Sequence, residues 1–148
     1  MKDLRVKIQV TKTISKRDLK SALCTATEGG DMRTWVSCVD GRVRDDLSLK
    51  DFYEGGKMQD PDDYWHWMQL VPLEEGCALV LEFHEDTVCW DGEERSSFDL
   101  DLAAIQRGTQ VMAEKYPRYF RELFEDGGDA VSGDVFAQCC VFGKIVYG

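Results

Sequence analysis

The sequence predicts an α+β fold, in which an antiparallel sheet of about four to six strands carries an N-terminal helix and two or three C-terminal helices on one face. Two observations lead to this prediction. Apolar and polar residues alternate in short segments, which is typical of half-buried strands, and most of these segments lie before residue 100. Apolar residues recur every three or four positions after Ser15 and again after Asp101, which is typical of helices. Because no linker or repeat interrupts the pattern, we expect residues 1–148 to form a single domain.

The first two elements are predicted to be a strand and a helix. In segment 4–14, LRVKIQVTKTI, the apolar side chains Leu4, Val6, Ile8 and Val10 share one face, as in a half-buried strand. Ser15 is then expected to cap a helix, with Asp18 at the capping-box position. Gly29 and Gly30 are expected to end that helix, because glycine adopts the left-handed conformation common at helix C-termini.

The middle of the chain is predicted to supply the rest of the sheet. Segment 34–39 is expected to be a strand, and a long polar stretch with a short helical turn near Ser48 follows it. Segments 64–73 and 77–86 are each expected to form a strand, joined by a turn. Segment 87–98 has Asp-Gly at its centre, which predicts a hairpin with a type I′ turn.

The last third of the chain is predicted to be helical. Asp101 is expected to cap a helix over 102–116, and Pro117 to open a second, short helix. A third helix is expected to begin near Ser132 and to stop at Gly143. The apolar residues after Gly143 are expected to dock against the domain, with Ile145 and Val146 buried; an exposed tail that mediates dimerisation is the alternative.

Few residues of this chain suggest catalysis or metal binding. Six cysteines lie in or beside apolar segments without a CxxC pair, so we expect reduced thiols that pack in the core. Two histidines are present, and no known catalytic or phosphate-binding motif occurs. The expectation is therefore a protein that is not an enzyme, with no cofactor and no metal.

Charge is the most informative bulk property. The formal net charge is −10. Residues 1–44 hold ten basic and five acidic side chains, whereas residues 45–148 hold eight basic and 23 acidic ones. This field opposes direct binding to nucleic acid or to anionic membranes and favours partners with a basic surface, although it also serves solubility. The N-terminal residues are charged and lack an apolar signal core, which favours the cytoplasm.

An acidic cluster in segment 74–101 is the first candidate site. The segment contains ten acidic side chains and a single arginine, Arg95. Charges on a hairpin also protect sheet edges against aggregation, so this is one interpretation. The other is a surface that binds a basic host protein. The candidate residues for this partner-binding face are Glu82, Glu85, Asp86, Asp91, Glu93 and Glu94.

A pocket lined by tryptophans is the second candidate site. Glycines at a helix end let a ligand approach backbone N–H groups, and a nearby indole can stack on it. The alternative is that the glycines only stop the helix and that the tryptophans pack in the core. The candidate pocket residues are Glu28, Gly29, Gly30, Trp35, Trp65 and Trp67.

Three segments together resemble an uncharacterised family of small phage and prophage proteins. They are ALCTATEGGDMRTWV, RGTQVMAEKYPRYFREL and SGDVFAQCCVFGKIVYG. The resemblance implies a phage accessory role, and small acidic phage proteins commonly inhibit host factors, including CRISPR and restriction defences. The first functional hypothesis is therefore an acidic, non-enzymatic inhibitor of a host protein. The second is a protein that sequesters a small molecule or nucleotide signal in the tryptophan-lined pocket.

Overall fold

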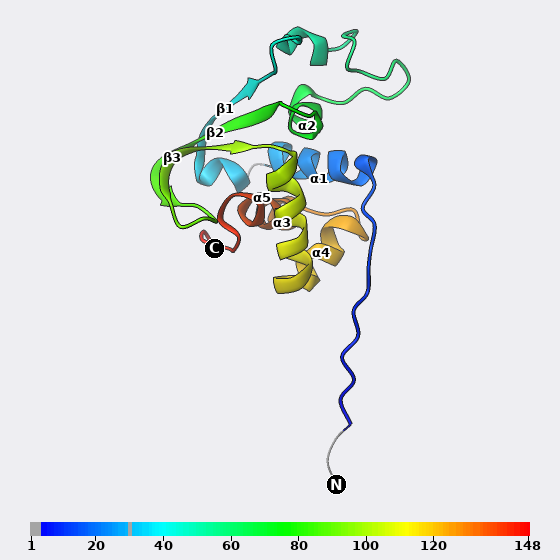
Figure 1. Ribbon diagram of the computed structural model, residues 1–148, viewed down its shortest axis with the longest axis vertical. Helices are drawn as coiled ribbons and strands as arrows, with labels where there is room; N and C mark the ends of the chain where they lie inside the picture. Colours follow the sequence, from blue (N-terminus) through cyan, green and yellow to red (C-terminus); the bar gives the residue numbers. More distant parts are fainter. Residues whose placement is uncertain (1–3, 30) are drawn as a thin grey trace.

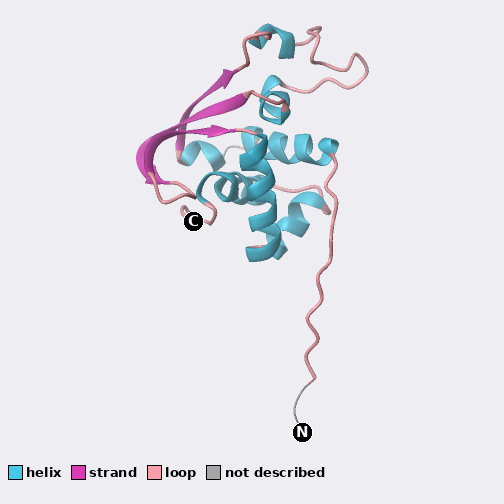
Figure 2. Cartoon of the chain, viewed as in Figure 1, coloured by secondary structure: helices cyan, strands magenta, loops and turns pink. Residues whose placement is uncertain are grey.

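The structure confirms an α+β architecture with an open antiparallel sheet. It is a computed structural model that describes residues 4–29 and 31–148. The strands of the sheet are β1 (Val36–Arg42), β2 (Ala78–Val88) and β3 (Glu94–Leu100), in the order β1-β2-β3. The helices are α1 (Lys16–Glu28), α2 (Trp67–Leu70), α3 (Leu102–Lys115), α4 (Pro117–Phe124) and α5 (Ala130–Phe142), with short 3-10 turns η1 (Asp31–Thr34), η2 (Leu49–Phe52) and η3 (Val71–Leu73). Figures 1 and 2 show the curved sheet on one side and the main helices packed against a single face.

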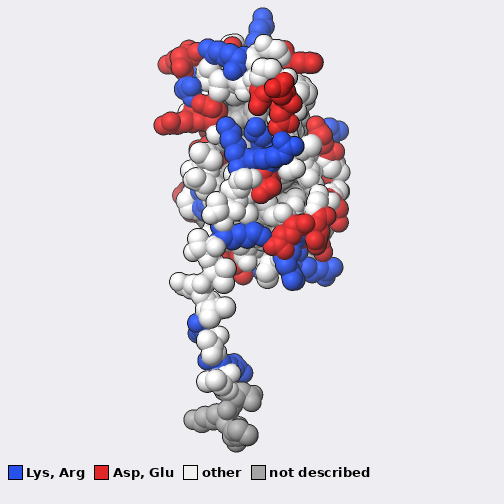
Figure 3. Space-filling view, turned by 90° about the vertical axis from the view of Figure 1, so that its right-hand side faces the viewer, with Lys and Arg blue, Asp and Glu red and all other residues white. Residues whose placement is uncertain are grey.

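The sheet has three strands in the described residues rather than four to six, and segment 4–14 accounts for part of the difference. This segment is extended, as its alternation predicts, but it lies outside the sheet and projects from the body as an arm (Figures 1 and 3). The side chains of Leu4, Val6, Ile8 and Val10 are 73–90% exposed. The alternating pattern therefore predicted the extended backbone correctly, but it did not show whether another strand pairs with this segment.

Segment 64–73 is the second correction, because it is helical. Its residues form α2 and η3, and the helix begins where Nδ1 of His66 accepts a hydrogen bond from the backbone N–H of Met68 at 3.3 Å. Consecutive residues from Gln69 to Leu73 are all buried, whereas a strand covered on one face would bury every second residue. An apolar run this short is compatible with either structure, and here tertiary packing decides.

The predicted caps of α1 and α5 are confirmed in part. Ser15 Oγ accepts from Asp18 N at 3.1 Å, as expected for the cap of α1. Gly29 ends that helix with φ −71°, a right-handed conformation rather than the expected left-handed one, and Gly30 lies outside the described residues. Helix α5 begins earlier than expected, because Asp129 rather than Ser132 is its cap. Gly143 ends it with φ +73°, as predicted.

The helices that follow the sheet begin where the sequence predicts. Asp101 Oδ1 accepts from Ala104 N at 2.9 Å and caps α3. Pro117 is the first residue of α4. The first N–H groups of a helix have no partner within the helix, so the missing N–H of proline costs no hydrogen bond there.

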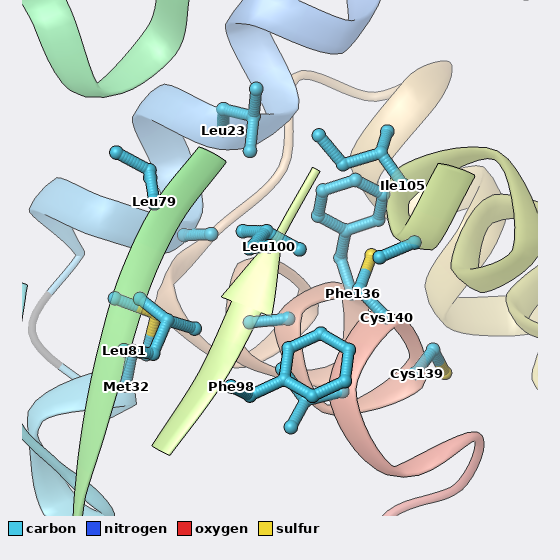
Figure 4. Packing of buried hydrophobic residues seen from close by; sticks show 14 of the residues in the cluster. Leu23, Met32, Leu79, Leu81, Phe98, Leu100, Ile105, Phe136, Cys139 and Cys140 are labelled. Atoms are coloured by element: carbon cyan, nitrogen blue, oxygen red, sulfur yellow. The ribbon is translucent and has the colours of Figure 1, made fainter. Parts of the chain in front are cut away.

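The core lies between the sheet and helices α1, α3 and α5. Figure 4 shows side chains of β2 and β3 directed toward side chains of the three helices. Those labelled include Leu79, Leu81, Phe98, Leu100, Leu23, Ile105 and Phe136, all of them at most 8% exposed. Helix α5 is central, because ten of its thirteen residues are buried. An almost entirely buried helix is apolar all round, which explains why its sequence shows so little amphipathic pattern.

The cysteines are free thiols, and four of them pack in the core as predicted. Those four are Cys77, Cys89, Cys139 and Cys140. Cys24 is half-buried, and Cys38 is exposed on β1, so the prediction was wrong for Cys38. A register shift between Val36 and Cys38 places Cys38 on the same face as Asp40 and Arg42, which the helices do not cover.

The chain after Gly143 turns back and docks on α5, as predicted. Gln138 Oε1 accepts from the backbone N–H groups of Val146 and Tyr147 at 2.8 and 2.9 Å, and Gln138 Nε2 donates to the carbonyl of Tyr147 at 2.9 Å. The Tyr147 ring stacks on Trp35 with 6.3 Å between the ring centroids. Ile145 is half-buried, but Val146 remains 41% exposed, which corrects the expectation that both would be buried.

No helix in the described part of the chain is long and apolar enough to cross a membrane.

Candidate functional site

The β2–β3 hairpin curls at its far end around the end of α5. Near its base β2 pairs regularly with β3, but between Glu82 and Thr87 the register shifts, so that residues 83–86 lie opposite the single residue Ser96. Extra residues on one strand bend it and increase its twist. The backbone N–H of Trp90 donates to the carbonyl of Val141 at 3.0 Å and so ties the turn to α5. The hairpin end is therefore held in a defined position.

The turn itself differs from the predicted type I′ geometry. Gly92 N donates to Cys89 O and Cys89 N donates to Glu93 O, both at 2.9 Å. Gly92 has φ +83°, whereas no non-glycine residue among those described has a positive φ. A type I′ turn needs two consecutive positive φ values, so this is a type I turn followed by a left-handed glycine. The hairpin prediction is confirmed and its turn type is corrected.

All six residues of the predicted acidic face are exposed. Glu85, Asp86, Asp91, Glu93 and Glu94 surround the curled end of the hairpin, and Glu82 lies farther back on the uncovered face of the sheet. Within the described part of the chain, Asp91 is the member of this set that forms an ion pair. The remaining five carboxylates are not neutralised by a basic neighbour within ion-pair distance there. The hairpin end is strongly negative as a result.

Asp91 is bound by Arg95 through two hydrogen bonds. Nη1 and Nη2 of Arg95 donate to Oδ1 and Oδ2 of Asp91 at 2.8 and 2.5 Å. This pair lowers the pKa of Asp91 to about 2, mainly through the Arg95 hydrogen bonds. Asp91 thus stabilises the turn and contributes less free charge than its neighbours.

Three exposed apolar side chains lie among these carboxylates. Val88, Trp90 and Val146 are 53%, 47% and 41% exposed. They line one groove of about 670 Å³ together with Asp86 and Glu94. Large apolar side chains surrounded by charged ones are typical of the centre and rim of a protein-binding surface. The sequence predicts a hairpin over residues 87–98 without singling out Trp90, although the position of Trp90 next to the Asp-Gly turn is a signal of exposure.

Arg107 of α3 fixes the orientation of the Trp90 ring. The guanidinium carbon lies 3.7 Å from the ring centroid, and Nη2 donates to the carbonyl of Cys140 at 3.2 Å. Burial lowers the pKa of Arg107, and its Nε is buried without a hydrogen-bond partner in the described residues. Lys115 and Lys144 line the same groove on the helix side. The groove therefore has a basic wall on the helix side and an acidic rim on the hairpin side.

The structure does not bring the predicted pocket residues together. Trp35 is 2% exposed and packs in the core, where its indole N–H donates to Asp134. Glu28 accepts from the thiol of Cys24 at 3.2 Å, and Gly30 lies outside the described residues. Trp35 stands just before β1, and it is buried because its ring packs against Phe83, Phe142 and Tyr147.

The other two predicted tryptophans face different surroundings. The indole N–H of Trp65 donates to Asp63 Oδ2 at 3.0 Å, and the cationic groups of Arg17 and Lys20 lie 5.8 and 5.7 Å from its ring. Trp67 instead lines a groove beside β1. The other apolar residues of that groove are Met32, Val36, Val39 and Met68.

The histidines and cysteines have structural roles where the structure describes them. Nδ1 of His66 caps α2, and Nε2 of His84 lies 3.0 Å from the carbonyl oxygen of Arg33. Burial raises the pKa of the Cys24 thiol to about 11 and that of Cys139 to about 12. These thiols remain protonated at neutral pH, and a protonated thiol is a weak nucleophile and a poor metal ligand. No group of three or more metal-ligating side chains occurs among the residues described.

Comparison with protein-family models, with curated proteins and with solved structures found no significant match.

Proposed function

We propose that the chain is a non-catalytic binding protein whose hairpin end docks on a basic surface of a partner protein. The main support for this proposal is that Trp90 is exposed and lies near carboxylates that form no ion pair in the described residues. Tryptophan is enriched among the residues that dominate binding energy, and it acts best when its ring is already oriented. Stacking on Arg107 supplies that orientation.

Charge selects the class of partner. The net charge of −10 and the five carboxylates around the hairpin repel phosphates and attract lysine and arginine. Basic surfaces on proteins are often those that hold nucleic acid, because phosphate contacts dominate that binding. A partner held by this hairpin would lose access to nucleic acid through the same surface. The proposed role is therefore inhibition of the partner protein by covering its nucleic-acid-binding surface.

The resemblance to small phage proteins suggests where such a partner occurs. It favours a bacterial host protein, and CRISPR and restriction components are the proposed class because both act on nucleic acid. The search for a partner should therefore begin in bacterial lysates, with purified nucleic-acid-binding proteins tested next.

A pair of matched variants tests the site. E93K/E94K reverses two hairpin carboxylates, and D45K/E54K reverses two exposed carboxylates elsewhere, so both change the net charge equally. We expect proteins captured by the wild type to be retained by D45K/E54K and lost with E93K/E94K and with W90A. Each captured protein is then tested for competition between this chain and a labelled nucleic acid. Equal binding by E93K/E94K and the wild type, with the fold intact by circular dichroism, would contradict the proposal.

A further inference from the structure

The arm formed by residues 4–14 is an amphipathic strand without a sheet. Leu4, Val6, Ile8 and Val10 are four of the ten large apolar side chains exposed in the described chain. Between them stand Arg5, Lys7 and Gln9, and residues 4–17 contain no acidic side chain. Figure 3 shows the arm extending clear of the body. Four adjacent apolar side chains on an extended backbone are unfavourable in water and are typical of a strand that pairs with another chain.

The root of the arm is fixed on the helical side of the molecule. Lys12 forms an ion pair with Glu125, and its ammonium group lies 5.3 Å from the centroid of the Phe120 ring. Figure 1 shows the N-terminal segment running away from the helices and from the sheet of its own chain. Residues 4–10 are therefore presented to another molecule rather than to the sheet of the same chain.

Strand β3 offers the matching edge. It pairs with β2 on one side, and its other side is an edge of the sheet. A groove of about 450 Å³ runs between this edge and α3. Phe98, Ala103 and Ala104 form an apolar part of its lining, beside the charged side chains of Asp91, Arg95, Asp101 and Arg107. Asp99 is exposed on the opposite face of the strand, where it forms an ion pair with Arg42 of β1. Strand β3 has seven residues, the same length as segment 4–10.

The two faces of the arm fit this edge. Side chains alternate between the faces of a sheet, so pairing with the apolar residues on the helix side places them over the groove. The same register places Arg5 and Lys7 on the outer face, beside Ser97 and Asp99.

We propose that the arm of one copy of the chain adds as a fourth strand to the β3 edge of a second copy, in a reciprocal exchange that makes a dimer. Reciprocal exchange of one segment is a common route to symmetric dimers. It covers apolar side chains on both arms and closes one edge of both sheets. No residue of the arm belongs to the acidic face, but the β3 edge includes Glu94 and its groove includes Trp90 and Asp91, so variants of the arm are the ones that test this inference separately.

The first test measures mass in solution on the full chain. Sedimentation velocity or light scattering of the wild type is expected to show a concentration-dependent dimer. V6Q/I8Q removes two apolar groups from each arm and should weaken dimerisation by more than about a hundredfold. The control is V131Q, which changes an exposed valine outside both surfaces and should remain dimeric. A wild type that is monomeric at high concentration, or a V6Q/I8Q variant as dimeric as the wild type, would overturn the proposal.

The second test identifies the edge. R5E/K7E should be monomeric, and adding S97K/D99K to the same chain should restore the dimer, because two lysines then face the two introduced glutamates. Hydrogen exchange should show slow amides in residues 4–10 and 94–100 of the wild type, and fast ones in V6Q/I8Q, with β1 unchanged. Protection that changes at β1 instead, or arm amides that exchange freely in the dimer, would refute the β3 assignment.

Discussion

The indole N–H of Trp35 donates to Oδ1 of Asp134 at 2.7 Å, and this bond connects the start of β1 to α5. The second carboxylate oxygen accepts from Gln138 Nε2 at 2.9 Å, and Gln138 also holds the chain end. Burial raises the pKa of Asp134, while the two donors oppose that rise. Strand, helix and chain end thus meet at a single half-buried carboxylate.

Replacing Trp35 with phenylalanine should make stability more sensitive to pH. Loss of a hydrogen bond to a charged group costs about 1.5–3 kcal/mol, and the smaller ring adds a packing loss that does not depend on pH. Because the bond favours ionised Asp134, the pKa of that group should rise further in W35F. The pKa of Asp134 is already raised in the folded state. Protonated Asp134 therefore stabilises the fold at low pH, and this stabilisation is lost as pH rises above about 3.9, the pKa of an aspartate in the unfolded chain. We expect a steeper fall in W35F.

Urea unfolding across the acid range measures this effect. The difference in unfolding free energy between wild type and W35F should grow as pH rises through the pKa of Asp134. The same comparison in a D134N background should lose that pH dependence. A difference that is constant with pH would show that the bond to Asp134 contributes nothing and that W35F acts only through packing.

Removal of residues 144–148 should lower the melting temperature at every protein concentration. The deletion removes the half-buried Ile145 and Tyr147 and leaves the fully buried amide of Gln138 without its main-chain partners. An unmet buried polar group costs about 1–3 kcal/mol, so the whole deletion should cost about 2–5 kcal/mol.

A double-mutant cycle with Q138A separates docking from a general loss of contacts. Because both changes break the same hydrogen bonds, their effects should be clearly less than additive. If the truncated protein kept its melting temperature and changed only its oligomeric state, the chain end would be an interface and not a docked segment.

Local signals in the sequence predicted the helices and the hairpin well. Ser15, Asp101 and Pro117 each marked a helix start, and the Asp-Gly pair marked the hairpin. The two wrong strands, 4–14 and 64–73, failed for different physical reasons. Alternation of apolar and polar residues indicates an extended backbone, but it does not show whether a neighbouring strand exists. A short apolar run indicates buried residues, but it does not show whether they form a helix or a strand.

For the candidate site, too, the properties set by neighbouring residues in the sequence were predicted better than those set by tertiary packing. Exposure of the acidic residues followed from their charge and position on a hairpin, as Glu93 and Glu94 illustrate. The tryptophans were assigned less well: Trp35 is core and Trp90 is exposed, the reverse of their selection as site residues. Sequence periodicity tells which residues share a face, but only the packing of the helices decides which face is covered.

Gly108→Ala should destabilise the protein, although helix propensity alone predicts the opposite. Alanine is favoured over glycine in a helix interior by about 1 kcal/mol. At Gly108, however, an added Cβ would lie 2.4 Å from Sγ, 2.5 Å from Cα and 2.6 Å from N of Cys140. Overpacking of this kind costs about 1–3 kcal/mol or more. We therefore expect a net loss of stability in chemical denaturation.

The origin of the clash can be tested with a second substitution. Cys140→Ala removes Sγ but leaves the close backbone atoms, so G108A/C140A should not recover the loss. Q106A, on the exposed side of the same helix, should be nearly neutral. Stabilisation by G108A would mean that α3 and α5 pack less closely than this geometry requires.

The pKa of Asp91 should depend almost entirely on Arg95. The two hydrogen bonds from Arg95 hold the pKa at about 2, so R95Q should return it toward its ordinary value of 3.8. A lowered folded-state pKa means that the pair stabilises the fold above the unfolded value of about 3.9, and that this contribution is lost as pH falls through about 2. NMR titration of the Asp91 carboxyl carbon measures the shift directly. If Asp91 titrated near 3.8 in the wild type, the bidentate pair would not persist in solution, and the hairpin end would carry one more free carboxylate toward its partner.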